Sequence, residues 1–196
     1  MKTVTQENLH RALWPFERKT ITAEELEAGL IPSKYLFWLT AALSMLFVAL
    51  FAIKASASNI IILPLAIVLA RLFAVDLAAL VLLNFYTAIL AIAGLALAPF
   101  TFADGYLNAI LGGVWCGVIF FLLSSFGYVL SKGKGGLGGG DFKLATALGL
   151  WLGLTGAIWL PALAMIINLP LAFIFPKREL PFGPGLILAF IILVMA

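Results

Sequence analysis

The segment that decides the fold is Leu107–Leu130, which reads LNAILGGVWCGVIFFLLSSFGYVL and contains no Asp, Glu, Lys, Arg or His. At about 1.5 Å of rise per residue, a helix of this length crosses the roughly 30 Å hydrocarbon core of a bilayer. The whole chain is 64% hydrophobic and 11% charged, whereas soluble domains are about half apolar and a quarter charged. The chain is therefore expected to fold in a membrane.

Five further apolar runs flank this segment and predict an all-α, polytopic transmembrane helix bundle with six or seven membrane passes. These runs are Tyr35–Ile53, Asn59–Val75, Ala78–Ala98, Phe142–Phe175 and Pro181–Ala196. We expect Pro64 to kink the second run. The run Phe142–Phe175 has the length of two short passes, or of a half-helix and one full pass. Its composition predicts breaks at Gly153, Gly156 and Pro161.

Residues 1–34 differ from the rest in composition, because they hold five acidic and five basic residues. We expect a cytosolic N-terminal segment, partly helical or flexible, followed by one membrane domain at residues 35–196. No signal peptide is expected, since no small-residue cleavage pattern follows the first apolar run. Basic residues border the apolar runs at the N-terminus, around 131–143 and at 177–178, but not in the loop 101–106. The positive-inside rule then places the N-terminus, Asp76 and residues 131–141 on the cytosolic side.

Composition also excludes several classes of function. A net charge of +3 is too small to indicate nucleic-acid binding. One cysteine, Cys116, allows no internal disulfide, and with the single His10 it offers no metal site. We therefore expect no cofactor. No internal repeat supports an inverted-repeat transporter.

Four acidic residues follow residue 34, namely Asp76, Asp104, Asp141 and Glu179. Ionisable groups at membrane depth are costly and are candidates for function. Asp104 precedes Gly105 in a polar turn, and Glu179 lies in a charged loop, so neither indicates chemistry. Asp76 and Asp141 instead each stand where an apolar segment is expected to begin, at the same depth.

Two carboxylates that share a site cannot both ionise easily, and one proton is then held between them. One group can act as a base on a water molecule while the other acts as an acid, without a metal. Asp76 and Asp141 are candidates for such a pair. The alternative is that both are helix N-caps, because Asp is favoured there.

The segment before Asp141 reads SKGKGGLGGGD from Ser131 and contains six glycines. It could be a flexible linker. It is not a Walker A loop, because the required Gly-Lys-Ser/Thr spacing is missing. Glycines before an Asp at a helix start also allow positive φ and a close approach of a substrate backbone. Gly138, Gly139 and Gly140 are thus candidates for shaping a site.

These residues resemble the motifs of a known family. Gly138-Gly139-Gly140-Asp141 is similar to the GxGD motif of intramembrane aspartic proteases. With Lys143 and the spaced Gly149 and Gly153, it resembles the type IV prepilin peptidases in particular. Asp76-Leu77, with Asn84 and Thr87 after it, resembles the family's first aspartate motif. The segment Pro181-Phe182-Gly183-Pro184 resembles its terminal motif.

The resemblance implies a membrane-embedded aspartic endopeptidase of the bacterial inner membrane, with Asp76 and Asp141 as its catalytic pair. Its partners would be prepilins or pseudopilins and the lipid bilayer. Lys143 could orient Asp141 or a substrate carboxylate, or else reach lipid phosphate. Asn84 and Thr87 lie eight and eleven residues past Asp76, so they could share a helix face with it.

Two departures from the family pattern keep other functions open. Leu83 stands where the family has proline, after the apolar stretch 78–82. A catalytically degenerate scaffold of a pilus or secretion system is therefore one alternative, and a small ion-coupled transporter is another. The pairs of Cys-x-x-Cys that accompany methyltransferase activity in two-domain members are missing, so we expect a stand-alone peptidase. The oligomeric state and the individual prepilin stay open.

Overall fold

The computed structural model describes residues 35–54, 62–130, 138–174 and 181–196. In these ranges all regular structure is helical, which confirms the all-α prediction. The six helices of the described residues are α3 (Leu36–Lys54), α4 (Ile62–Ala79), α5 (Asn84–Thr101), α6 (Tyr106–Leu130), α7 (Gly139–Ile174) and α8 (Gly183–Met195). The predicted cytosolic segment 1–34 lies outside the described residues, as does most of the glycine-rich segment.

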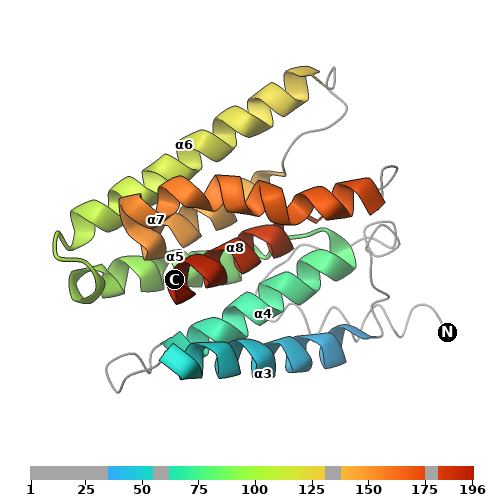
Figure 1. The fold of residues 1–196 in the computed structure, drawn as a ribbon, viewed down its shortest axis with the longest axis horizontal. Coiled ribbons are helices and arrows are strands. Elements are labelled where there is room, and N and C mark those ends of the chain that lie inside the picture. Colours follow the sequence, from blue (N-terminus) through green and yellow to red (C-terminus); the bar gives the residue numbers. More distant parts are fainter. Residues whose placement is uncertain (1–34, 55–61, 131–137, 175–180) are drawn as a thin grey trace. The chain divides into compact units, whose positions relative to one another are not determined.

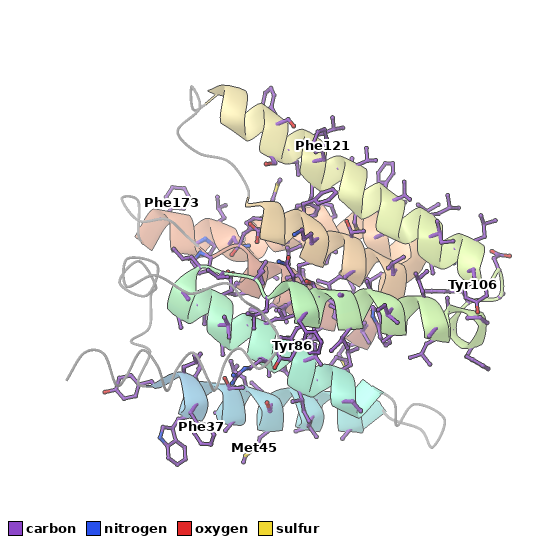
Figure 2. All side chains as sticks on the ribbon, turned by 180° about the vertical axis from the view of Figure 1, so that it is seen from behind. Phe37, Met45, Tyr86, Tyr106, Phe121 and Phe173 are labelled. Carbon is purple, nitrogen blue, oxygen red and sulfur yellow. The ribbon has the colours of Figure 1, made fainter. Side chains whose placement is uncertain are left out.

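Several helices suit a bilayer by length and composition. Asn84–Thr101, Tyr106–Gly127 and Gly139–Pro170 are long and apolar enough to cross a membrane, while Leu36–Ala52 and Gly183–Met195 are shorter apolar helices. Large apolar side chains also face outward, among them Phe37, Met45 and Phe173, which extend away from their helices in Figure 2. Apolar surface of this extent belongs in contact with lipid tails rather than water. The chain is a polytopic helical membrane protein.

The helices group into two compact units, residues 1–85 and 86–196. In the first unit, α3 packs along α4, as Figure 1 shows. The rings of Phe47 and Phe73 meet edge to face with centroids 6.0 Å apart, a geometry worth about 0.5–1.5 kcal/mol beyond its buried area. This helix pair carries Asp76 near the end of α4.

In the second unit, α6 and α7 approach closely through small residues. A Cβ atom added to Gly149 would lie 2.5 Å from the carbonyl oxygen of Gly112, and one added to Gly112 would collide with the backbone of Gly149 and Gly153. Gly113 similarly leaves room for the side chain of Leu150. Small residues spaced four apart let helices in lipid make backbone contact, where packing rather than the hydrophobic effect drives association.

Helix α7 is broken at Gly153, whose φ of 62° and ψ of −178° are not helical. Residues 139–152 would span about 21 Å and residues 154–174 about 31 Å. The first arm runs along α6 from Gly117, near Thr146, to Gly112, near Gly153. Beyond the break, Ala157 contacts Cys116, so the chain turns back along α6 (Figure 1). The predicted break at Gly153 is confirmed, whereas helix continues through Gly156 and Pro161.

Two side chains of α6 form hydrogen bonds with backbone groups of α7 that the break at Gly153 and the proline at 161 leave without helical partners. Asn108 Oδ1 accepts a hydrogen bond of 2.8 Å from the N–H of Leu154, directly after the break. Cys116 donates through its thiol to the carbonyl of Ala157 at 3.6 Å. That carbonyl lacks its usual helical donor because Pro161 has no N–H. In lipid such groups must be satisfied within the protein.

Replacing Asn108 with Ala is expected to destabilise the protein, because it leaves the Leu154 N–H without this acceptor. The expected loss is about 1–3 kcal/mol in the free energy of unfolding, measured by denaturation in detergent. Thr101→Ala is the control, since the Thr101 hydroxyl is exposed and bonds only to the carbonyl of Leu97 in its own helix. Equal stability of the two variants would show that Asn108 does not hold the break.

The boundary between the second and third predicted spans was placed wrongly. We expected a break at residues 76–77, where the charge interrupts the apolar pattern. In the structure α4 continues through Asp76 and ends at Ala79, and it is followed by Leu80, whose φ is 53°. Residues 81–83 are non-helical and α5 begins at Asn84. Pro64 produces no kink, because it stands in the first turn of α4, where its missing N–H costs nothing.

Candidate active site

Asp141 lies in the first turn of α7. Its Oδ2 accepts a hydrogen bond of 3.1 Å from the N–H of Gly138, and its own N–H donates to the Gly138 carbonyl at 3.1 Å. The carboxylate thus caps its own helix from the third helical position, as the acidic residue of a capping box does. A negative charge there is also favoured by the helix dipole. These bonds orient the side chain through one oxygen and leave Oδ1 for another partner.

The three glycines directly before Asp141 have backbone conformations that other residues could also adopt. Gly138, Gly139 and Gly140 all lack a positive φ, since among the described glycines only Gly105 and Gly153 have one. The freedom that glycine gives for a left-handed backbone is therefore not used at these three positions, and their role in shaping a site stays a prediction. Space is what distinguishes Gly139, where an added Cβ would have no atom within 4 Å.

The start of α7 is fixed by α6. The ring of Phe142 lies 6.5 Å from that of Phe121, and a Cβ added to Gly117 would touch the Thr146 hydroxyl at 3.0 Å and Phe142 at 3.5 Å. Thr146 in turn bonds to the carbonyl of Phe142 at 2.9 Å. Rigid packing directly after Asp141 holds the first turn of α7 in place. Lys143 projects from this turn and is exposed.

Asp76 lies in the last turn of α4 and is buried, with 4% of its surface exposed. It takes part in an interaction with the rest of the protein. Because Asp76 closes a helix instead of opening an apolar segment, our expectation for its position is wrong, and the alternative of an N-cap is excluded for it. A carboxyl group buried in a membrane helix needs a partner or a proton.

Asn84 and Thr87 both lie on α5, at its first residue and one turn later. They do not share a helix with Asp76, because residues 80–83 separate α4 from α5. Our expectation of a common helix face is therefore wrong. Thr87 is buried, with 5% exposure, whereas Asn84 is exposed.

The two candidate carboxylates belong to different units of the chain, Asp76 to residues 1–85 and Asp141 to residues 86–196. Asp141 lies at the start of a helix that is long and apolar enough to cross a membrane, and Asp76 lies in the last turn of α4. Their pairing stays a prediction from the sequence, as do the roles of the glycines, Lys143, Asn84 and Thr87. Among the described residues, no group of three or more His, Cys, Asp or Glu side chains could hold a metal ion.

Much of the membrane part of this chain is similar to a known protein family. A model of the type IV leader peptidase family matches residues 60–175, which is more than half of the chain. The protein belongs to the type IV leader peptidase family. The match contains both candidate aspartates and the whole of α4, α5, α6 and α7.

A curated relative agrees with this assignment. The chain is 39% identical over 82 residues to the prepilin leader peptidase/N-methyltransferase of Neisseria gonorrhoeae. The aligned part covers 40% of this chain and 28% of that relative, so the similarity spans about a quarter of the relative's length. No solved structure matches the chain.

Proposed function

We propose that this protein is a membrane-embedded aspartic endopeptidase that removes leader peptides from prepilin-like proteins. It would act at the cytosolic face of the bacterial inner membrane, with its N-terminus in the cytosol and residues 35–196 as its peptidase domain. The observation that carries the proposal is membership of the type IV leader peptidase family together with Asp141, held by Gly138 at a helix start. The basic residues around 131–143 and 177–178 support the orientation.

In the proposed mechanism, Asp76 and Asp141 share one proton and hold a water molecule between them. One carboxylate takes a proton from the water as it attacks the scissile carbonyl, and the other, which is protonated, donates its proton to the carbonyl oxygen. As the C–N bond breaks, the first group passes the proton that it took to the leaving amine, and the second regains a proton from the gem-diol oxygen. The Gly138 bond to Oδ2 supports this assignment, because it fixes the carboxylate while leaving Oδ1 available. The open space at Gly139, two residues before Asp141, is where we place the extended substrate backbone.

The test is cleavage of a purified prepilin by the purified protein in detergent or lipid. We expect a shortened product, and we expect unchanged activity after treatment with EDTA, since two carboxylates activate water without a metal ion. The control is a zinc peptidase treated in the same way, which EDTA inactivates. Loss of cleavage in EDTA that zinc restores would contradict the aspartic mechanism.

The same assay separates the alternatives. Binding of prepilins without cleavage, under conditions where a related peptidase cuts them, would favour a degenerate scaffold. Ion flux through proteoliposomes that contain the purified protein, together with no cleavage, would favour a transporter. The apolar stretch 78–82 and Leu83, which is 1% exposed, are the features that favour the scaffold.

A further inference from the structure

Asn168 is a buried polar residue in the second arm of α7, and nothing in the sequence motifs drew attention to it. It is 8% exposed. Its Nδ2 donates to the carbonyl of Ala164 at 2.9 Å, one turn earlier, and to the carbonyl of Phe182 at 3.3 Å, fourteen residues later. Asn168 therefore joins α7 to the turn that begins α8, across residues 175–180.

The turn is shaped around this amide. Gly185 packs directly on Asn168, and a Cβ added to Gly185 would collide with its Nδ2 and Cγ atoms. Phe182, the N-cap of α8, makes no side-chain capping bond of its own. Its carbonyl accepts both the Asn168 amide and the N–H of Leu186, the latter at 3.2 Å. The amide at 168 therefore reaches the Phe182 carbonyl only because residue 185 has no side chain.

Stability alone does not account for an asparagine at this position. Among the described residues, Asn168 Oδ1 is buried and has no hydrogen-bond partner. Burial of such an unsatisfied acceptor is unfavourable, and an apolar side chain would avoid that cost. We therefore explain the asparagine by the position that its hydrogen bond gives to the turn at Phe182.

The turn that Asn168 holds and the first turn of α7, which carries Asp141, both contact α6. The ring of Phe182 lies 5.9 Å from the ring of Phe120 on α6. The next residue of α6, Phe121, contacts Phe142, which directly follows Asp141. The turn at the start of α8 and the first turn of α7 therefore pack on adjacent residues of α6.

We propose that Asn168 is a positioning residue that holds the turn 181–185 against α6, so that this turn forms one wall of the substrate site beside Asp141. The inference rests on the proposed peptidase function for its effect on the substrate. The contact between Asn168 and the turn does not depend on that function and is measured separately.

The experiment combines hydrogen exchange with kinetics on the full-length protein in detergent. In Asn168→Ala we expect amide exchange in residues 181–187 to accelerate about fivefold, the effect of one lost hydrogen bond. We expect KM for a purified prepilin to rise by a similar factor while kcat changes less than about twofold. Thr40→Ala is the matched control, since Thr40 also bonds to a carbonyl one turn earlier, that of Leu36 at 2.8 Å.

A second variant separates hydrogen bonding from packing. The double variant Asn168→Ala with Gly185→Ala returns a methyl group to the space of the amide without restoring the donor. We expect it to keep the fast exchange and the raised KM. Recovery of both values in the double variant would overturn the proposal in favour of packing alone.

Other outcomes also decide the matter. Unchanged exchange in Asn168→Ala would overturn the proposal, as would a lower kcat with unchanged KM, which indicates a smaller fraction of folded enzyme. A wild-type protein that cleaves no prepilin would remove the proposed function and the substrate role together. In that case a change in exchange would still show that Asn168 holds the turn.

Discussion

Replacing Asp141 with Asn is expected to lower the rate of prepilin cleavage by about 10²- to 10⁴-fold, the usual contribution of a general acid or base. The amide has nearly the shape of the carboxylate, so the side chain can still accept the Gly138 bond through its oxygen. It can neither take a proton from water nor exchange one with a partner. Single-turnover kinetics with a purified prepilin measure the loss.

The matched control for this change is Asp104→Asn. Asp104 is an exposed residue in the turn between α5 and α6, and its carbonyl, not its side chain, accepts a bond from Leu107. The same chemical change there is expected to leave cleavage unaltered. Both variants must also insert into the membrane and unfold at wild-type denaturant concentrations. Cleavage by Asp141→Asn at the rate of Asp104→Asn would contradict the proposed catalysis.

The equivalent change at Asp76 tests whether the two carboxylates work together. Asp76→Asn is expected to lose as much activity as Asp141→Asn, and the double variant is expected to lose little more, because groups that act as a unit are not additive. Multiplication of the two losses would instead indicate two independent roles. Retained cleavage in both single variants would remove the aspartic mechanism.

The sequence predicted the part of the site that is encoded locally. Glycines followed by Asp at the start of an apolar run indicate a helix N-terminus, and Asp141 lies in the first turn of α7. The break at Gly153 was also predictable, because glycine tolerates the positive φ that this reversal requires. Gly156 and Pro161 gave similar signals without breaking the helix. At Pro161, a thiol from α6 bonds to the carbonyl of Ala157, which the proline leaves without its helical donor.

The part that was wrongly predicted depends on tertiary structure. The helix that contains Asp76 ends at Ala79, and the next residue, Leu80, has no turn preference but adopts a left-handed conformation. A charged residue in an apolar run does not by itself end a helix, so the pattern placed this boundary four residues too early. Asn168 was missed for a related reason, because its partner Phe182 is distant in the chain. A buried amide in an apolar run was the one signal available.

The second large effect is expected for Gly112→Ala, which should destabilise the protein by about 1–3 kcal/mol or more. The new methyl group would meet the backbone of Gly149 and Gly153, which cannot move aside as a flexible side chain can. The helices α6 and α7 would have to separate along the contact that orients both arms of α7. Denaturation in detergent measures the loss, and cleavage is expected to fall with the fraction of folded protein.

Gly139→Ala is the matched change, because the same methyl group would there have no atom within 4 Å and no left-handed backbone to strain. We expect its stability to equal that of the wild type within about 0.5 kcal/mol. Its KM for prepilin is nevertheless expected to rise about tenfold or more, since the methyl group occupies space proposed for the substrate backbone. Gly112→Ala would thus lower the stability of the protein, whereas Gly139→Ala would raise only the KM for prepilin. A Gly139→Ala protein that binds and cleaves prepilin normally would show that the open space beside Asp141 is not where the peptide lies.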